Sequence, residues 1–365
     1  MPMPRFEVAT AQKVVFGPGT VRELGALVSE HGERVLLVTG SRPERHAVLP
    51  DAVRWPVSGE PTMLMIEDGA AMARKMNAEV VMAVGGGSVI DAGKAIAAMC
   101  TQPGSLSRYI EIVGEGKPLE AAPLPFIAVP TTAGTGAEVT RNAVLLSEEH
   151  GVKASLRHVW MLPRLALIDP ELALSVPPDV TAASGMDALT QCLEAYVCSR
   201  AQPFTDALCA DGIQRAMRAL PRVFENGEDV EARCEMALCA MYSGMALANA
   251  GLGAVHGFAA PIGGMFHAPH GAVCAALLAP VWARNASRAV NGEKFAQVDA
   301  WLGGDAVEWL RGMTERLRIP GLARWGVTVA HFDEIAIKAA AASSMRGNPV
   351  RLEHAELVDL LREAL

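Results

Sequence analysis

The stretch 83-AVGGGSVIDAGKAIA-97 decides how the first half of the chain folds. It follows the apolar run EVVM at 79–82, so it has the pattern of a turn between a buried strand and a helix. Three consecutive glycines are costly to order, which indicates that bare backbone is needed at this turn. Glycine lets a pyrophosphate approach the N–H groups that begin a helix. A plain structural turn is the alternative, because the stretch is neither a GxGxxG fingerprint nor a P-loop.

The pattern around this turn recurs along the first half of the chain. Short apolar runs that end in Gly, Ser or Thr alternate with helical patterns, which favours a mostly parallel sheet covered by helices. The apolar runs are 34–40, 79–87 and 125–136, and the helical patterns are 19–32 and 88–100. After 165–177 the strand signals stop and long helical patterns follow. We therefore predict an α/β dinucleotide-binding domain over 1–175 and an all-helical metal- and substrate-binding domain over 176–365.

Composition narrows the class of partner. The 365 residues carry a net charge of −8 and no Lys/Arg cluster, which argues against nucleic acid or an anionic membrane and favours a small molecule. The N-terminal residues lack the pattern of a signal peptide, so we expect a cytoplasmic protein. Seven cysteines are scattered without a CxxC pair, which predicts buried free thiols and suggests neither a disulfide framework nor a cysteine zinc site.

One segment could be mistaken for membrane-spanning sequence. From Met236 to Ala283 there is no Asp, Glu, Lys or Arg, a length that could hold two spans. Asn249, Pro261, Pro269 and three histidines interrupt it too often for helices that face lipid. We therefore interpret it as a charge-free core segment that carries His256, His267 and His270.

Three loops rich in small residues are candidates for nucleotide binding. In a parallel α/β sheet, ligands bind where strands end and loops turn into helices. The candidate cofactor residues there are Thr39, Gly40, Ser41, Gly86, Gly87, Ser88, Thr131, Thr132 and Thr135. Asp91 and Lys94, one turn into the helix that follows GGGS, would either contact the ligand or form only a solvated ion pair at i and i+3.

The second half contains a pattern typical of a metal site. Asp187 and Gln191 are four residues apart and so share one face of a helix. The charge-free segment adds His256 and His270, and a catalytic zinc typically takes three protein ligands. The alternative is that both histidines are core residues whose hydrogen bonds go to the backbone. His267 is a surface residue, an outer-shell residue or a proton relay.

Taken together, these motifs resemble those of the iron-containing, group III alcohol dehydrogenases. GGGSVIDAGK, PTTAGTGAEVT, GMDALTQCLEAYV, GLGAVHGFAAPIGG and PHG occur in the order and approximate spacing of that family. KVVFGPG near the start, MLPRLALIDPEL and GNP at 347–349 are also similar to it. The resemblance implies the dehydroquinate synthase-like, iron alcohol dehydrogenase fold, with NAD or NADP bound to the α/β domain, a divalent metal bound to the helical domain, and a homodimer.

The resemblance also assigns roles to particular residues. Gly86, Gly87 and Ser88 would cradle the pyrophosphate, while Thr131, Thr132 and Thr135 would line the adenine and phosphate side. Lys153 matches a lysine that reaches the nicotinamide ribose. Asp187, His256 and His270 match metal ligands for iron or zinc.

The chain departs from the family pattern at three places. Gln191 and Ala260 stand where the metal-dependent members commonly have histidine, which puts the usual four-ligand iron site in question, although three ligands could hold zinc. Thr39-Gly40-Ser41-Arg42 replaces a loop that carries an Asp in many NAD-preferring members. A neutral loop with a nearby Arg can accept a 2′-phosphate, so NADPH is permitted.

We expect reversible hydride transfer between a nicotinamide and a small alcohol or aldehyde. A metal on Asp187, His256 and His270, with Gln191 beside them, would act as the Lewis acid, and His267 is a candidate proton relay. In a metal-free enzyme similar to maleylacetate reductase, His256 and His270 would instead act as acids on a keto acid. Two further alternatives are a lyase similar to 3-dehydroquinate synthase, which leaves NAD unchanged, and a non-catalytic relative that binds the dinucleotide.

Overall fold

The computed structural model describes residues 5–41 and 52–365. By the contacts within it, the chain forms an α/β unit of residues 9–132 and 136–176 and a helical unit that begins at Pro177. Residues 5–8 and Ala133–Thr135 group with the helical unit. For the second segment the reason is local: the Gly134 carbonyl accepts a hydrogen bond from Ser243 Oγ at 3.3 Å, and Gly134 packs against Ser184.

The α/β unit is built on a parallel sheet, which confirms the predicted fold class. Six strands lie in the order β1-β8-β5-β4-β2-β3, and each adjacent pair is parallel. They are β1 (Val14–Phe16), β2 (Val35–Gly40), β3 (Val53–Val57), β4 (Val80–Gly85), β5 (Phe126–Pro130) and β8 (Leu165–Ile168). A separate antiparallel hairpin, which the apolar runs did not indicate, joins β6 (Asn142–Ser147) and β7 (Val152–Arg157).

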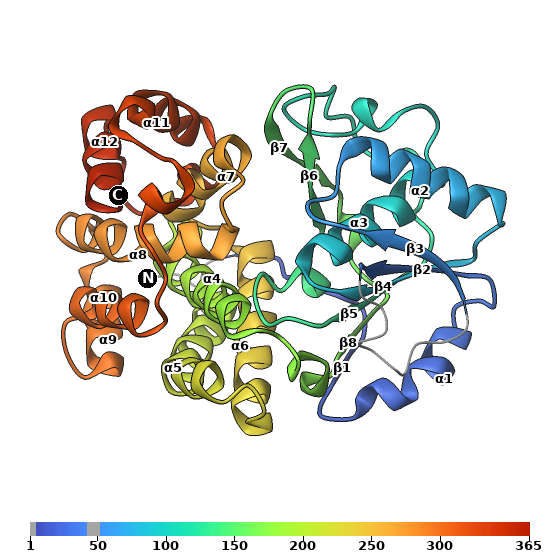
Figure 1. Cartoon of the computed structure of the whole chain (residues 1–365), viewed down its shortest axis with the longest axis horizontal. Helices are drawn as coiled ribbons and strands as arrows, with labels where there is room; N and C mark the ends of the chain where they lie inside the picture. The colour runs from blue at the N-terminus through green and yellow to red at the C-terminus, as the bar shows by residue number, and fades with distance from the viewer. Residues whose placement is uncertain (1–4, 42–51) are drawn as a thin grey trace. The chain divides into compact units, whose positions relative to one another are not determined.

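Helices cover both faces of this sheet (Figure 1). Successive strand residues point to opposite faces. Leu36 and Val38 accordingly belong to one core cluster with α2 (Met63–Lys75) and α3 (Gly87–Met99), whereas Leu37 belongs to another with α1 (Leu24–Ser29). Burial on both faces explains why these strands are continuous apolar runs in the sequence.

The helical unit is assembled around α4, which packs against α5, α6 and α8. Its helices are α4 (Pro178–Val197), α5 (Pro203–Glu225), α6 (Val230–Asn249), α7 (Ala254–Phe266), α8 (His270–Ala286), α9 (Gly292–Leu302), α10 (Ala306–Arg316), α11 (Phe332–Ala341) and α12 (His354–Glu363). A central helix surrounded in this way buries polar side chains as well as apolar ones, and α4 carries three of the polar groups that matter below.

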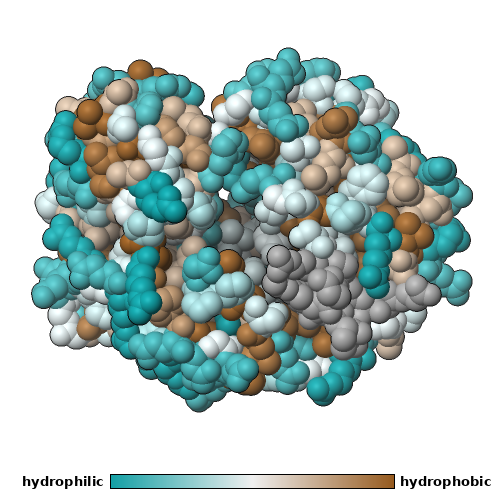
Figure 2. Space-filling view, in the orientation of Figure 1, coloured by the Kyte–Doolittle hydropathy of each residue, from teal (hydrophilic) through white to brown (hydrophobic). Residues whose placement is uncertain are grey.

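The charge-free segment lies mainly in the core of this unit. It covers most of α6, all of α7 and most of α8, whose apolar side chains fill one hydrophobic cluster. No single helix of the described residues is long and apolar enough to span a membrane. The consecutive helices α6 and α7 together have the length and apolar composition of a span, but the chain bends by 98° between them. On the face shown in Figure 2, hydrophobic residues are interspersed among hydrophilic ones, as is usual for a globular surface.

Candidate active site

One face of α4 supplies the carboxylate of the site. Asp187, Gln191 and Glu194 are spaced at i, i+4 and i+7, so they follow one another along the same side of the helix. Only 3%, 2% and 4% of their surfaces are exposed, because neighbouring helices enclose α4. A buried carboxylate is costly unless it is paired or bound to a metal, so the surroundings of Asp187 should contain its partners.

The partners come from the junction of α7 and α8. His256 lies in the first turn of α7, and His270 is the first residue of α8. Gly271 lets α8 approach α4 closely, since a Cβ there would lie 2.0 Å from the Ala183 carbonyl oxygen and 3.2 Å from the Asp187 Cβ. The start of α8 thereby brings His270 to the carboxylate of Asp187, which His256 reaches from α7.

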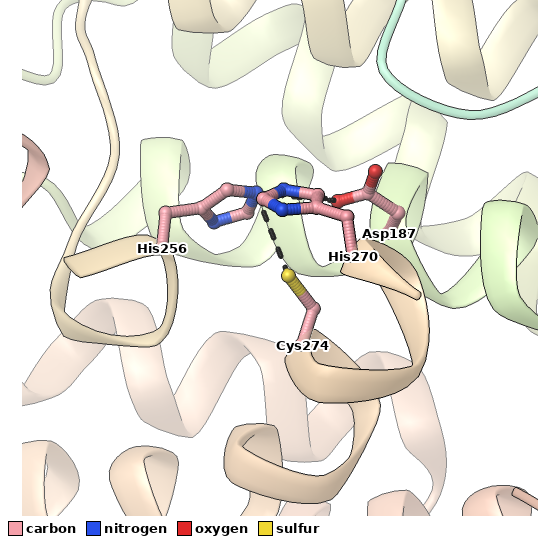
Figure 3. Close-up of side chains that lie close together, drawn as sticks. All are labelled: Asp187, His256, His270 and Cys274. Carbon is pink, nitrogen blue, oxygen red and sulfur yellow. Dashed lines mark hydrogen bonds and ion pairs between the residues drawn. The ribbon is translucent and has the colours of Figure 1, made fainter. Parts of the chain in front are cut away.

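Four side chains converge at this point: Asp187, His256, His270 and Cys274 (Figure 3). One donor atom from each lies within 4.8 Å of all the others. Asp187 Oδ1 is 3.2 Å from His256 Nε2 and 3.8 Å from His270 Nε2, and Cys274 Sγ is 3.8 Å from His256 Nε2. All four donors belong to the helical unit.

These separations fit a tetrahedral metal. Zinc bond lengths and a tetrahedral angle place two N or O ligands about 3.3–3.4 Å apart, and an N and an S ligand about 3.6 Å apart. The three distances given above are within about half an ångström of those values. Imidazole nitrogen, carboxylate oxygen and thiolate sulfur are all established zinc donors, so the residues fit the divalent metal that the sequence predicted.

The electrostatics of the cluster favour charged forms despite its burial. Burial works to raise the pKa of Asp187, but the imidazoles of His270 and His256 outweigh it and hold that pKa below its ordinary value. Burial works to lower the pKa of His256, but the Cys274 sulfur and the carboxylates of Asp187 and Glu194 raise it well above its ordinary value. The buried carboxylates of Asp187 and Glu194 therefore stabilise positive charge at this position.

Glu194 orients His256. Its Oε2 lies 2.7 Å from His256 Nδ1, so the ring nitrogen on that side donates to the carboxylate and Nε2 is left to face Asp187. A carboxylate on the far nitrogen of a ligating histidine fixes the tautomer and raises the basicity of the ligand. The pair Glu194–His256 is thus arranged as such an outer-shell contact.

The first turn of α7 is held by residues from elsewhere in the chain. Gly253 precedes the helix and offers no capping side chain. Glu194 Oε1 accepts from the Val255 N–H at 2.7 Å, and Asn348 Oδ1 accepts from the Ala254 N–H at 3.1 Å. Helix N-termini leave such donors unpaired, so these two side chains replace the missing cap. This contact gives a physical role to the GNP motif.

The other residues predicted for this site have different environments. Gln191 is buried next to Asp187 along α4, and its Oε1 has no hydrogen-bond partner among the described residues. His267 is exposed, ends α7 with a left-handed backbone (φ 52°), and is not one of the four grouped side chains. Ala260 is half-buried in α7.

The candidate dinucleotide site lies at the carboxyl ends of β2 and β4. The chain leaves β2 toward β3 and leaves β4 toward β5, so the strand order reverses between these neighbours. Open α/β sheets bind ligands at such a switch point. Thr39 and Gly40 end β2, with Ser41 following them, and Gly85 ends β4.

The GGGS turn has the tight geometry that this role needs. A Cβ on Gly85 would lie 2.6 Å from the Val89 Cβ, so only glycine allows the chain to pass directly from β4 into α3. Gly86 precedes the helix in an extended conformation and faces Thr132, whose Oγ1 would be 3.5 Å from a Cβ added there. Gly87 and Ser88 begin α3 and are half-buried, so their N–H groups lie at the positive end of the helix.

Thr131 continues from β5 beside this turn. Its N–H donates to the Gly85 carbonyl at 2.9 Å, and the residue is buried. Thr135 follows within the segment that groups with the helical unit. Arg42, which the sequence analysis linked to a 2′-phosphate, lies outside the described residues.

The pair Asp91–Lys94 is not solvated. The Lys94 side chain is fully buried and donates to the Ala137 carbonyl at 2.7 Å, Thr140 Oγ1 at 3.0 Å and the Asn142 carbonyl at 2.8 Å. Asp91 Oδ2 accepts from the Val144 N–H at 3.0 Å. Both residues therefore fasten the loop after β5 and the start of β6 to α3.

Lys153 lies on β7 and forms an ion pair with Glu60 at 2.8 Å. Its side chain is largely buried, whereas that of Glu60 is exposed. The assigned role of Lys153 at the nicotinamide ribose remains a prediction, as do the roles of the other cofactor residues.

Sequence reasoning missed two residues of the site, Glu194 and Cys274. Both carry a signal in their spacing: Glu194 is seven residues after Asp187, and Cys274 is four after His270, so each shares a helix face with a predicted ligand. The cysteine pattern suggested no zinc site, yet the structure places Cys274 in the group of possible metal ligands. The cysteines, all within the described residues, form no disulfide, and six of the seven, Cys274 included, are buried.

The α/β unit has a parallel sheet with a glycine turn suited to a dinucleotide, and the helical unit has an Asp-His-His-Cys cluster suited to a metal. Together these features indicate an oxidoreductase that uses a nucleotide cofactor and a metal. Comparison with known families agrees. Residues 11–170 match the family described as "Iron-containing alcohol dehydrogenase", and residues 181–365 match the one described as "Fe-containing alcohol dehydrogenase family, C-terminal". The chain belongs to the iron-containing alcohol dehydrogenase family and is an oxidoreductase that acts on alcohols. Members of this family bind NAD(P) and a metal.

Individual relatives extend over nearly the whole chain. The chain is 33% identical to choline dehydrogenase of Bacillus subtilis (strain 168), covering 94% of this chain and 90% of that protein. The structure of a 1,3-propanediol oxidoreductase superposes with a TM-score of 0.90 at 31% identity, covering 99% of this chain and 100% of the other. Sulfoacetaldehyde reductase from Bifidobacterium kashiwanohense, in complex with NAD+, gives a TM-score of 0.90 at 26% identity, covering 99% of both chains.

Proposed function

We propose that this enzyme transfers a hydride between NAD(P) and a small alcohol or its aldehyde, with a divalent metal held by Asp187, His256 and His270. The observation that carries the proposal is the convergence of these three donors at separations of 3.2 and 3.8 Å on one side of the helical unit. A metal bound there would polarise the substrate oxygen as a Lewis acid.

The protein groups around the donors suit this chemistry. Glu194 holds His256 with Nε2 directed at Asp187, so one ligand is oriented before a metal arrives. The His270 side chain is 32% exposed, whereas those of Asp187 and His256 are almost fully buried. Substrate would therefore approach from the His270 side, away from the enclosed carboxylate. His267 is exposed and lies three residues before His270, the first residue of α8, so it is our candidate for moving a proton between this side and solvent.

For the cofactor we propose the GGGS turn and its neighbours. Gly86, Gly87 and Ser88 would bind the pyrophosphate through backbone N–H groups at the start of α3, while Thr131, Thr132 and Thr135 would line the adenine and phosphate side. Thr39, Gly40 and Ser41 form the adjacent strand end. Because no acidic side chain lies among these three, both NADH and NADPH should be accepted.

The class of substrate follows from the relatives. Three of them are named for choline, 1,3-propanediol and sulfoacetaldehyde, which are all small polar alcohols or aldehydes. We propose the same class here, in a cytoplasmic homodimer. The location rests on the sequence pattern, and the dimer rests on the family resemblance.

The deciding experiment measures metal content and activity on the same preparation. Untagged protein is analysed for zinc and iron, and oxidation of NADH and NADPH is followed with small aldehydes and with maleylacetate, before and after chelation. We expect close to one metal per chain and loss of activity on chelation, restored by adding metal. H256A should lose both metal and activity, whereas H354A, which removes an exposed histidine paired with Asp333, should keep both.

Two results would count against the proposal. Full aldehyde reduction by metal-free protein would make His256 and His270 acid catalysts, as in the alternative similar to maleylacetate reductase. Dinucleotide binding with no net NAD(P) turnover on any of these substrates would favour a lyase or a non-catalytic relative.

A further inference from the structure

The position of Cys274 points to a ligand set different from the one that the sequence suggested. Cys274 is in the second turn of α8, four residues after His270, so both side chains project from the same face of that helix. Its sulfur lies 3.8 Å from His256 Nε2 and within 4.8 Å of the Asp187 and His270 donors. Figure 3 shows the sulfur pointing toward the two imidazoles.

We propose that the Cys274 thiolate is the fourth protein ligand of the metal, so that the site is Asp187, His256, His270 and Cys274 and suits zinc, with the substrate oxygen adding as a fifth ligand. The inference rests on the proposed function, since it assumes that a metal binds at these donors. On coordination the thiol loses its proton to solvent as the sulfur–metal bond forms.

The competing candidate for the fourth position is Gln191. Its Oε1 is buried without a hydrogen-bond partner among the described residues, so an acceptor is available one helical turn from Asp187. An amide oxygen is a hard, neutral ligand, which suits magnesium or calcium better than a metal that also takes two imidazoles. Thiolate sulfur is the stronger donor for zinc, and Cys274 lies at the separation that a zinc site requires.

A structural role for the thiol alone explains less. The chain has other buried cysteines in the helical unit, such as Cys192 and Cys239, which lie among apolar helices. Cys274 differs from them because it lies beside three other potential ligands, one of which, His256, is held by the Glu194 carboxylate. Replacing a family histidine by Gln191 would remove one nitrogen ligand, and Cys274 supplies a donor to the same cluster from a different helix.

The test uses cobalt as a spectroscopic probe in place of zinc. The full-length protein is freed of metal, titrated with Co²⁺, and its near-ultraviolet and visible spectra are recorded beside those of C274S and C239S. Cobalt bound to thiolate gives an intense near-ultraviolet charge-transfer band, whereas oxygen and nitrogen ligands give only weaker visible bands. We expect the charge-transfer band in the unmodified protein and in C239S, an equally buried thiol in the same unit, and its loss in C274S.

Affinity provides the second measurement. C274S should weaken zinc binding by more than the about 10- to 100-fold that the loss of an outer-shell partner costs. Adding Q191H to C274S should recover much of that affinity without restoring the charge-transfer band, because the family histidine would then replace the sulfur. Circular dichroism confirms that each variant is folded, and C274A replaces C274S if the serine variant does not fold.

The outcomes separate this inference from the proposed function. Stoichiometric cobalt without a charge-transfer band in the unmodified protein would overturn the assignment of Cys274 and leave the three-ligand site intact. A band that persists in C274S would also overturn it. No binding of zinc or cobalt at all would remove the metal from the proposed function, and this inference with it.

Discussion

Oε2 of Glu194 lies 2.7 Å from Nδ1 of His256, with both side chains almost completely buried. The same carboxylate accepts the Val255 N–H, so Glu194 sets both the position of the first turn of α7 and the orientation of the imidazole that this turn carries. A buried contact of this kind positions a metal ligand, so its loss should change metal affinity as well as the reaction rate.

Substituting Glu194 should therefore weaken metal binding. E194A removes the acceptor for His256 Nδ1, and we expect metal affinity to fall about 10- to 100-fold. E194Q keeps an amide oxygen that can accept either the Val255 N–H or Nδ1–H, so its loss should be smaller. Competition titration against a chelating dye measures the affinity, and urea unfolding reports any loss of the helix cap. Affinity unchanged in a folded E194A would show that Glu194 serves the helix alone.

A second prediction concerns the approach of α8 to α4. A methyl group at Gly271 would meet the Ala183 carbonyl, which is backbone and cannot rotate away. G271A should displace the start of α8, destabilise the protein by about 1–3 kcal/mol or more, and separate His270 from Asp187. Metal content and thermal unfolding report the two effects.

The matched control is G312A in α10, where nothing lies within 4 Å of the added Cβ. There the substitution should stabilise the helix by up to about 1 kcal/mol and leave metal binding unchanged. Equal behaviour of the two variants would mean that the close approach at Gly271 does not position His270.

The sequence predicted the elements around GGGS because local signals agree there. Apolar strands buried on both faces are unbroken runs, and a glycine turn marks where β4 ends and α3 begins. The hairpin β6–β7 was not predicted because its strands alternate between half-buried and buried positions instead of forming unbroken apolar runs that end in Gly, Ser or Thr.

The same contrast holds within the site. Asp187, His256 and His270 could be proposed from spacing and resemblance, since ligand residue types in charge-free sequence are conspicuous. The contact of Glu194 with His256 could not, because it joins residues 62 positions apart and depends on how α7 packs against α4. Cys274 was grouped with the inert thiols for the same reason: its chemistry depends on neighbours from two other helices.

A third prediction tests the buried cation of the α/β unit. Burial lowers the pKa of Lys94 to about 8, although Asp91 and Glu138 act to raise it. K94M would remove three hydrogen bonds and take this buried cation from Asp91 and Glu138, so we expect about 3–5 kcal/mol of destabilisation. The loop that carries Thr131 and Thr132 should loosen with it, weakening NAD(P) binding.

The double variant D91N/K94M separates charge from packing. Because it also removes one of the uncompensated carboxylates, it should lose less stability than K94M in urea unfolding. K117M, which removes a half-exposed lysine, should change stability by no more than about 0.5 kcal/mol. A K94M variant as stable as K117M would show that Lys94 does not hold this loop.

The last prediction concerns the dependence of stability on pH through Glu356. Its carboxylate accepts from the Glu353 N–H at 3.0 Å and pairs with Arg284 of α8 and with Arg288, two residues after that helix, and these contacts lower its pKa to about 2. For an acid whose folded pKa lies below the unfolded value near 4.5, the unfolded chain binds more protons in between. The stabilisation is therefore fully present above about pH 4.5 and is lost as the pH falls toward 2.

E356Q should cost about 1–2 kcal/mol at pH 7, because the side chain is 21% exposed and solvent weakens the pairing. Urea unfolding of both proteins at several pH values should show this gap closing between pH 4.5 and 2. A gap that stays constant over that range would mean that packing of α12 on α8, and not the charge of Glu356, accounts for the loss.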